Sequence, residues 1–413
     1  MSNLNSESGE YIFQHLETED DIEQNLELMR TVFGQEGVDN LVKKLVYHHP
    51  TMTFRDFLVI KHHGKIVAGL NLIPMKWSIG GMPLKVAEMG CVATLADYRH
   101  RGLQRRLINE FHKRAAEQEY NLCAIEGIPY FYRQFGYEYA LPLNEETRIK
   151  LDQIPDYESK LNIRSFINKD IPKASQLLTQ SQRKFYVHTI RDEEIWKMQE
   201  ETRIESENRF EGYILEKDDQ TIAYFRISDR PAEKELILRE VADTNQNASE
   251  AILKFLKDIG EKRGLETLVA RTSYYDPFAR QLVALGAVQR MPYAWQIRVM
   301  DYAKIFLKMK SLFEKRFAAS AYCHLSEKLN FNFYRYAVQV AVEDGKITDI
   351  NKLDSSEDRN IRVNPQVFAQ LLLGHRSREE LEAIYPDFII YPSHKNLIDT
   401  LFPKLPSHIH SAY

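Results

Sequence analysis

The sequence predicts an α+β fold built from more than one unit, and three observations support this. The chain has 413 residues, too many for one ordinary hydrophobic core, so two or three domains are expected. Short apolar runs typical of buried strands alternate with stretches of helical spacing. Around residues 151–165 the composition becomes polar and includes a proline, which marks a domain boundary.

The first part of the chain alternates helices and strands. After a polar tail at 1–9, apolar residues at helical spacing follow an acidic start in 20–33. The runs 57–60 and 66–70, joined by His63-Gly64, are typical of a hairpin. The remaining expected elements are a helix over 38–47, strands over 11–13, 72–79, 84–95 and 121–125, and a helix over 103–119.

The charge of the chain limits its possible partners. The formal net charge of −4 argues against general affinity for nucleic acids or membrane surfaces. The first ten residues are polar and acidic, and no apolar run approaches the length of a membrane span. We therefore expect a cytoplasmic protein without a nucleic-acid or membrane partner.

Cysteines and histidines give no sign of disulfides or metal ligands. Cys91, Cys123 and Cys323 have no paired spacing, so they are expected to be buried thiols of a reducing cytosol. The adjacent histidines at 48–49 and 62–63 lack a glutamate or cysteine at ligand spacing. No metal site is predicted.

One stretch carries the strongest chemical signal. The apolar run 89–95 predicts a buried strand, helical spacing begins at Leu103, and a basic turn (Arg-His-Arg-Gly) lies between them at 99–102. The first N–H groups of a helix lack intrahelical partners and the helix dipole is positive there, so this turn favours a phosphate. Gly102 allows close approach of the backbone. Alternatively, the arginines form a solvated helix face.

Two motifs in this order resemble the GNAT acetyltransferases. Their pyrophosphate-binding arm has the signature Arg/Gln-x-x-Gly-x-Gly/Ala, and Arg99, Gly102 and Gln104 occupy the three positions. Gln104 departs from the usual small residue. The segment 126–137 (Glu-Gly-Ile-Pro-Tyr-Phe-Tyr-Arg-Gln-Phe-Gly-Tyr) is similar to the GNAT segment in which a tyrosine faces the thioester sulfur. The resemblance implies acetyl-CoA as acyl donor, bound where two strands splay apart.

The second part of the chain repeats the pattern without its chemistry. The interval 92–136 spans 44 positions and the interval 241–286 spans 45, which suggests a second copy of the fold. Asn245 stands where the basic turn would be, and Leu282 takes the place of the tyrosine. Expected elements are strands over 213–215, 222–227, 235–241 and 268–270, a helix over 252–259, and, in the last hundred residues, a helix over 302–313 and a strand over 331–342.

The end of the chain sharpens the resemblance. Leu-Leu-Leu-Gly-His-Arg-Ser at 371–377 and Leu-Phe-Pro at 401–403 look like the enhanced intracellular survival (Eis) acetyltransferases. The implied fold class is α+β: two GNAT mixed-sheet domains, the second degenerate, and a C-terminal domain like sterol carrier proteins. The implied domains are 1–152, 153–300 and 301–413.

The resemblance to Eis proteins implies Tyr132 as the catalytic acid. Tyr132 matches the family pattern Tyr-x-x-Phe-Gly-Tyr, and a phenol of pKa about 10 suits protonation of a departing thiolate. The alternative is that the tyrosines of this segment are aromatic core residues. We favour the core interpretation for Tyr130 and Tyr137, and the catalytic one for Tyr132.

A lysine-like amine, of pKa about 10.4, also needs a base at neutral pH. The resemblance points to the terminal carboxylate of Tyr413, which would have to reach back into the active cleft; the alternative is a disordered end. Glu88, 11 positions before Arg99 on the central strand, is a rival base of the kind found in histone acetyltransferases. The alternative is that Glu88 is a strand-edge carboxylate with a salt partner, and this is the interpretation we favour.

The resemblance also implies a cofactor-binding set. Backbone groups at the end of the strand would hold the acyl and pantetheine portion, and the basic turn would hold the diphosphate. The residues that follow the next strand would lie at the edge of the splayed strands. These residues are Val92, Ala93, Thr94, Arg99, His100, Arg101, Gly102, Leu103, Gln104, Arg105, Gly127 and Ile128.

The predicted function is therefore acetyl-CoA-dependent N-acetylation of a primary amine. The resemblance implies an aminoglycoside-like or polyamine-like small molecule, or a peptide lysine, and a homohexamer. The alternative is a lipid or ligand carrier in which the GNAT units are scaffold. A third function, nucleic-acid binding through the arginines, would require salt-sensitive affinity.

Overall fold

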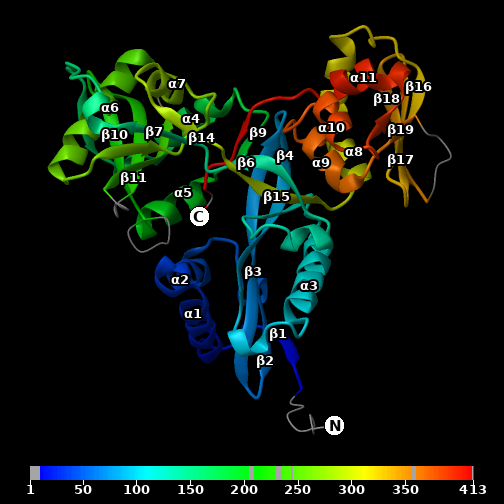
Figure 1. Ribbon diagram of the computed structural model, residues 1–413, viewed down its shortest axis with the longest axis horizontal. Coiled ribbons are helices and arrows are strands. Elements are labelled where there is room, and N and C mark those ends of the chain that lie inside the picture. The colour runs from blue at the N-terminus through cyan, green and yellow to red at the C-terminus, as the bar shows by residue number, and fades with distance from the viewer. Residues whose placement is uncertain (1–9, 204–208, 229–233, 243–244, 355–359, 412) are drawn as a thin grey trace.

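The structure is a computed structural model that describes residues 10–203, 209–228, 234–242, 245–354, 360–411 and 413. Three lobes meet at the centre of the molecule (Figure 1). The N-terminal lobe forms the stem, and the second and third units form two arms above it. The last residues of the chain run between the arms and end above the stem. The tail predicted at 1–9 lies outside the described residues.

The first sheet forms the stem. Its order is β1 (Ile12–His15), β2 (Phe57–His62), β3 (Lys65–Ile79), β4 (Met82–Thr94), β5 (Leu122–Ile125), β15 (Tyr293–Val299) and β6 (Glu138–Leu143). β4 and β5 are parallel, whereas β2, β3 and β4 are antiparallel neighbours. The predicted hairpin is confirmed, and β3 continues through the predicted strand 72–79 without a break.

Helices cover both faces of this sheet (Figure 1). α1 (Glu19–Phe33) and α2 (Val38–His48) pack on one face with Phe57 and Val59 of β2. α3 (Leu103–Glu117) packs on the other face with Leu58 and Ile60. Successive strand residues point to opposite faces, so the uninterrupted apolar run of β2 serves both layers. The three helices confirm the helices predicted from apolar spacing.

The second sheet has the same plan as the first. Its order is β8 (Asn162–Ser165), β10 (Phe210–Lys217), β11 (Gln220–Ser228), β12 (Glu235–Ala242), β13 (Thr267–Ala270), β7 (Glu146–Lys150) and β14 (Val288–Arg290). β12 and β13 are parallel, and α6 (Gln246–Lys262) connects them. α4 (Ile171–Gln182), α5 (Glu193–Thr202) and α7 (Pro277–Ala284) complete this unit.

The two units exchange a strand. β7 follows β6 in the chain but pairs with β13 and β14 of the second sheet. β15 follows β14 but pairs with β5 and β6 of the first sheet. Each exchanged strand occupies the sixth position of its sheet. Strand pairing therefore crosses the expected boundaries at 152 and 300.

The third unit packs a five-stranded sheet against helices. Its strands are β16 (Glu327–Asn332), β17 (Ala337–Glu343), β18 (Lys346–Leu353), β19 (Ile361–Arg362) and β20 (Ile389–Ile390), and its helices α8 (Tyr302–Ala318), α9 (Pro365–Leu372), α10 (Arg378–Ile384) and α11 (Lys395–Leu401). Aromatic side chains fill the interior, including Phe306, Phe331, Phe368 and Phe402.

Two predictions about this unit are wrong. The single strand expected over 331–342 is two strands, because Phe333 N–H donates to the Tyr336 carbonyl across a tight turn in which Tyr334 has φ +66°. Cys323 is exposed, since it lies in the turn after α8, whereas Cys123 is buried as predicted and Cys91 is half-buried. Among the described residues, no helix is both long and apolar enough to span a bilayer.

Candidate active site

The basic turn leaves the N-terminus of α3 open. Gly102 is the N-cap residue with φ +76°, and no side chain caps the helix. The first intrahelical bond runs from Arg106 N–H to the Gly102 carbonyl, 3.2 Å. The N–H groups of residues 103–105 therefore have no partner within the helix. A Cβ at position 102 would meet no atom within 4 Å, so the approach to these groups is clear.

The arginines in and after this turn differ in how strongly other residues already bind their side chains. Arg101 donates to the Tyr11 hydroxyl (2.7 Å) and Arg106 to the Tyr11 carbonyl (2.9 Å), so both tie the turn to the segment before β1. Arg105 donates to Gln134 and its guanidinium lies over the Phe135 ring. The Arg99 side chain is exposed, with one weak bond (3.4 Å) to the Thr94 carbonyl. Of the four, Arg99 has the fewest contacts that would compete with a phosphate.

The contacts of the Gln104 side chain explain why this position does not need the usual small residue. Its Nε2 donates to the Ala93 carbonyl (2.6 Å) and lies 2.9 Å from Thr94 Oγ1. The side chain thus turns away from the helix end and fastens α3 to the last residues of β4. The backbone N–H of Gln104 stays at the open terminus.

The strands beside this turn splay apart. β4 and β5 pair at only three positions, and the last pair joins Glu88 to Ala124. β4 continues to Thr94. Its ladder with β3 shifts register where Cys91 and Val92 lie opposite Leu70, and Cys91 has φ +51°. A bulge of this kind interrupts the ladder and redirects backbone groups, and such distortions gather near active sites.

Tyr132 lies beside the end of β5. Its ring packs so closely on Gly127 that a Cβ there would come within 2.3 Å of a ring carbon, which only glycine permits. The residue is 4 % exposed, and burial raises the pKa of its phenol, which therefore stays protonated at neutral pH. Within the described part of the chain its hydroxyl has no hydrogen-bond partner.

The third unit holds the turn that carries Tyr132, η4 (Phe131–Phe135). Gln366, in the first turn of α9, donates to the carbonyls of Arg133 (2.9 Å) and Tyr137 (3.3 Å). Arg298 of β15 donates to the Phe135 carbonyl. Groups far away in sequence therefore fix this turn.

The neighbouring tyrosines differ from each other. Tyr137 is fully buried and hydrogen-bonds His112 at 3.0 Å, which confirms the predicted core role. Tyr130 is 78 % exposed with φ +66°, so its predicted core role is wrong. Tyr130 lies in the loop between β5 and η4, and this loop leaves Ile128 exposed too. The Gly127 carbonyl accepts from Tyr293 (2.7 Å) and Gln296 (2.9 Å).

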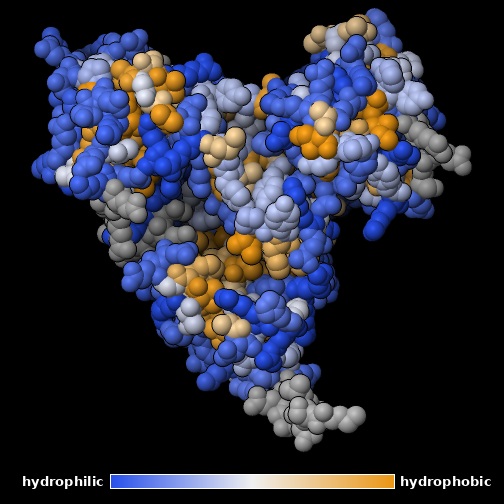
Figure 2. Space-filling model, in the orientation of Figure 1, coloured by the Kyte–Doolittle hydropathy of each residue, from blue (hydrophilic) through white to orange (hydrophobic). Residues whose placement is uncertain are grey.

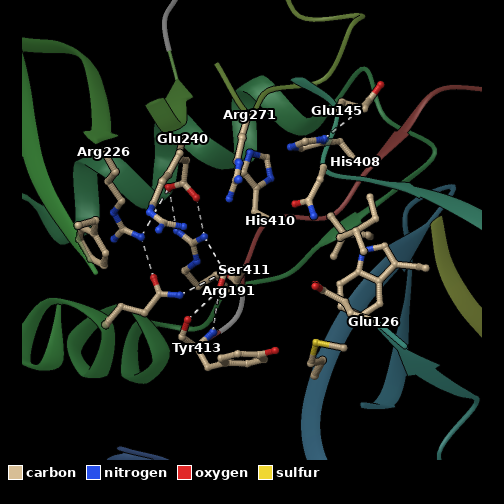
Figure 3. A pocket seen from close by; sticks show the side chains of 18 of the residues that line it. Glu126, Glu145, Arg191, Arg226, Glu240, Arg271, His408, His410, Ser411 and Tyr413 are labelled. Atoms are coloured by element: carbon tan, nitrogen blue, oxygen red, sulfur yellow. Dashed lines mark hydrogen bonds and ion pairs between the residues drawn. The ribbon is translucent and has the colours of Figure 1, made fainter. Parts of the chain in front are cut away.

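The end of the chain docks in a cavity of about 350 Å³ between the first and second units (Figure 3). β21 (Ser407–His408) pairs with β9 (Val187–Thr189), which itself pairs with β3. The Tyr413 hydroxyl donates to Glu88 Oε1 at 2.8 Å. The Tyr413 phenol, rather than its carboxylate, therefore contacts the rival base Glu88, and the described residues at the end of the chain line the cavity.

The cavity wall carries charge of both signs. Glu88 and Glu126 line it beside the splayed strands, and Glu145 lines it next to His408 (Figure 3). Arg191 and Glu240 line it from the second unit. The residues from the second unit were not predicted from the sequence, because that unit lacks the basic turn and the tyrosine of the first. The one available signal was the charged pair at 239–240 inside an apolar strand. Within the described ranges, no group of three or more His, Cys, Asp or Glu could hold a metal ion.

Comparison with known proteins defines the class. Residues 15–140 match the family described as acetyltransferase (GNAT) domain. The sequence finds no match among curated proteins. The stem therefore carries a GNAT acetyltransferase domain.

Solved structures identify the wider architecture. A GCN5-related N-acetyltransferase from Anabaena variabilis is similar over 97 % of this chain and 99 % of its own (TM-score 0.74, 16 % identity). A probable N-acyltransferase from Enterococcus faecalis covers 98 % and 100 % (TM-score 0.73, 15 % identity). Eis1 from Mycobacterium abscessus covers 98 % and 100 % (TM-score 0.65, 13 % identity). The predicted Eis-like GNAT architecture and α+β fold class are confirmed.

Proposed function

We propose that this protein transfers an acetyl group from acetyl-CoA to a primary amine of a small molecule or a peptide lysine. One observation carries the proposal. The open N-terminus of α3, flanked by arginines, lies beside the splayed strands β4 and β5. The protonated Tyr132 lies beside the end of β5, and the Glu88 carboxylate lies at the last paired position of β4.

The residues around α3 fit an acyl-CoA. The open N–H groups of residues 103–105 suit a diphosphate, and Arg99 and His100 are exposed beside them. When bound there, acetyl-CoA would supply an acyl group already activated as a thioester. The residues proposed to hold it are Val92, Ala93, Thr94, Arg99, His100, Arg101, Gly102, Leu103, Gln104, Arg105, Gly127 and Ile128. Arg101 and Arg105 would act mainly by charge, since their side chains are engaged elsewhere.

Tyr132 is the proposed acid. Burial keeps its phenol protonated, so it can donate that proton to the departing thiolate. The resulting phenolate then takes up a proton from solvent. The terminal carboxylate of Tyr413 is the proposed base, which accepts the proton of the incoming ammonium. Glu88 accepts the hydrogen bond of the Tyr413 phenol and so positions the Tyr413 ring. In this role Glu88 is not itself the base.

The cavity favours a cationic acceptor. Glu88 and Glu126 line the side next to the splayed strands, where an ammonium would enter. Opposite charges attract more strongly in a partly enclosed site than in bulk water. Polyamine-like or aminoglycoside-like amines fit this description. Apolar surface lies in the hollow above α1 and α2 (Figure 2), and this hollow offers the acceptor its way in.

The carrier alternative finds less support. Its ligand would occupy the third unit, but the aromatic core of that unit is packed, with Phe306 and Phe368 fully buried and 6.0 Å apart between ring centroids. We retain as proposals the three domains 1–152, 153–300 and 301–413, the sterol-carrier-like class of the third, a cytoplasmic location and a homohexamer.

The decisive experiment combines binding and turnover. Titration calorimetry should detect acetyl-CoA binding at one site per chain, and a panel of amines should release free thiol with formation of the N-acetyl product. Absence of cofactor binding at millimolar concentration would refute the proposal and favour the carrier. Light scattering tests the hexamer separately.

A further inference from the structure

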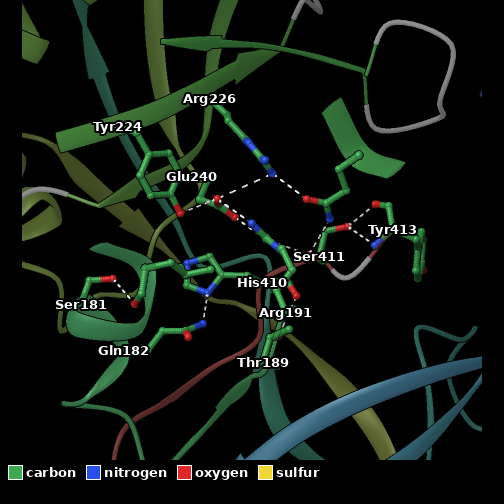
Figure 4. Close-up of polar contacts among 12 residues, drawn as sticks. Ser181, Gln182, Thr189, Arg191, Tyr224, Arg226, Glu240, His410, Ser411 and Tyr413 are labelled. Carbon is green, nitrogen blue, oxygen red and sulfur yellow. Dashed lines mark hydrogen bonds and ion pairs between the residues drawn. The ribbon is translucent and has the colours of Figure 1, made fainter. Parts of the chain in front are cut away.

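The second unit has a buried ion-pair network at its centre (Figure 4). Arg191 donates to both oxygens of Glu240, at 3.0 and 2.7 Å, and its side chain has no exposed surface. Tyr224 donates to the same carboxylate at 2.7 Å, and Arg226 lies 3.7 Å away. The Arg191 guanidinium also lies over the Trp196 ring, 4.5 Å from its centroid. The guanidinium is therefore fixed on several sides.

This network occupies the position that corresponds to the acyl site of the first unit. β12 and β13 pair only as far as Leu238 and Ala270, just as β4 and β5 pair only as far as Glu88. The ladder between β11 and β12 shifts register at Arg239, and Glu240 is the next residue. In both units a bulge therefore follows the last parallel pair. In the second unit, charged side chains fill the space that the splay creates.

The same arginine holds the end of the chain (Figure 4). Arg191 Nη2 donates to the Ser411 carbonyl at 2.8 Å, and Gln199 Nε2 donates to the same oxygen at 3.2 Å. Thr189, two residues before Arg191, donates from its hydroxyl to the His410 carbonyl at 2.7 Å. Two consecutive carbonyls of the terminal segment are thus fixed by side chains of one short stretch.

These contacts continue to the last residue. Ser411 Oγ donates to the main-chain oxygen of Tyr413 at 2.7 Å, and the Tyr413 hydroxyl donates to Glu88 on β4. A chain of hydrogen bonds therefore runs from Glu240 through Arg191 and Ser411 to Tyr413. The terminal residue is held from the second unit at one end and from the first unit at the other.

We propose that Arg191 is a positioning residue for Tyr413, and that the degenerate unit has turned its own acyl site into a clamp for the catalytic terminus. Glu240 orients the guanidinium, and the guanidinium fixes Ser411. This inference rests on the proposed function only in that Tyr413 serves acetyl transfer. The docking of the terminus by Arg191 can be measured without any reaction.

The test compares Arg191→Met with Arg164→Met. Arg164 is a matched control, because it also forms a two-bond ion pair in the second unit (Asp170, 2.7 and 2.8 Å) but does not contact the terminus. The first readout is the rate at which a carboxypeptidase releases Tyr413. The second is the separation of kcat from KM for acetyl-CoA. Thr189→Val, which keeps the Arg191–Glu240 pair, serves if Arg191→Met does not fold.

We expect Arg191→Met to release Tyr413 about tenfold faster or more and to lower kcat by a similar factor, with KM for acetyl-CoA within about twofold. Arg164→Met should change neither, and Thr189→Val should act in the same direction by a smaller factor. Release no faster than in the Arg164 variant, or faster release with unchanged kcat, would overturn the proposal. A natural chain that acetylates no amine while the release result holds would instead refute the proposed function.

Discussion

The two GNAT-like units share a strand order but differ at the helix that follows the central strand. α3 begins at Gly102 without a side-chain cap, whereas α6 begins at Asn245, whose side chain accepts from Ala248 N–H at 3.0 Å. An open helix terminus leaves N–H groups for a phosphate, and a capped one satisfies a donor within the chain. One side chain therefore distinguishes the open helix terminus, the proposed phosphate site, from the capped one.

The units differ again where their central strands splay. In the first, the space beyond Glu88 opens to a cavity that the terminal residue reaches. In the second, Arg191 and Glu240 fill the corresponding space. A buried pair of charges is tolerated only when both partners are fixed and hydrogen-bonded, and this pair is. The comparison suggests that a duplicated catalytic fold can lose its ligand and become support for the other copy.

Removing the proposed acid should have the largest effect on kcat. This change tests most strongly whether the first unit, and not the second, is the catalytic one. Tyr132→Phe should lower kcat by about 10²–10⁴-fold, the usual contribution of a general acid or base. KM for acetyl-CoA should change little, because the ring still packs on Gly127. Tyr130→Phe is the control, since Tyr130 is exposed. Equal turnover of the two variants would exclude Tyr132 as the acid.

Displacing the terminus should have the next largest effect. Two glycines appended after Tyr413 should lower kcat by about 10²-fold, because the carboxylate is moved while the phenol can keep its bond to Glu88. Glu88→Gln, which retains an acceptor oxygen, should cost less. If instead the extended chain is fully active and Glu88→Gln is not, Glu88 is the base.

A negative charge at position 102 should raise KM for acetyl-CoA if the N-terminus of α3 binds the diphosphate. Asn and Asp both tolerate positive φ, so Gly102→Asn and Gly102→Asp form a matched pair. Only Asp brings a carboxylate to the diphosphate site, and a like charge near a protein surface costs on the order of 1–4 kcal/mol. KM for acetyl-CoA should therefore be about tenfold higher, or more, for Asp than for Asn.

The corresponding change in the second unit should affect stability instead. Asn245→Ala removes a cap and should lower the free energy of unfolding by about 1 kcal/mol. KM for acetyl-CoA should stay unchanged, as measured on the same preparation by denaturation and steady-state kinetics. A raised KM would mean that α6 also takes part in cofactor binding.

Acid should produce the smallest effect, a loosening of the docked terminus. Burial, with further contributions from the charges of His408, Arg191 and His188 against the opposing Glu240, lowers the pKa of His410 well below its usual value. His410 also accepts from Gln182 at 3.0 Å. The released segment would bind a proton below about pH 6.5, so docking is strongest above that pH and weakens as the pH falls.

Release of Tyr413 by carboxypeptidase should therefore accelerate by at most about tenfold per pH unit below pH 6.5, after correction for the pH profile of the protease. His410→Gln should flatten this dependence. A natural chain and a His410→Gln chain with the same pH profile would show that His410 does not control docking.

Local signals were enough to predict the basic turn and the stem elements from β1 to β5, but not β6 and β15. Helical spacing located α1, α2 and α3, and a strand followed by Arg-x-x-Gly located the turn. Glycine at 127 and tyrosine at 132 are also local, but their contact was visible only in three dimensions. Spacing alone did not reveal that Tyr130 turns outward, because its positive φ depends on the fold of the turn.

Long-range pairing could not be predicted in this way. β7 and β15 look like ordinary last strands of their own units, yet each pairs in the other sheet. Nothing near Arg191 in sequence indicates that it binds a carbonyl at position 411. Such contacts depend on how the sheets assemble, and strand propensity carries no information about the partner strand.

The most direct test of the central claim is a structure of the complex with coenzyme A. The account predicts the diphosphate within hydrogen-bond distance of the N–H groups of residues 103–105, the sulfur beside the Tyr132 hydroxyl, and nothing bound at Asn245. A diphosphate at α6, or a sulfur remote from Tyr132, would contradict the account.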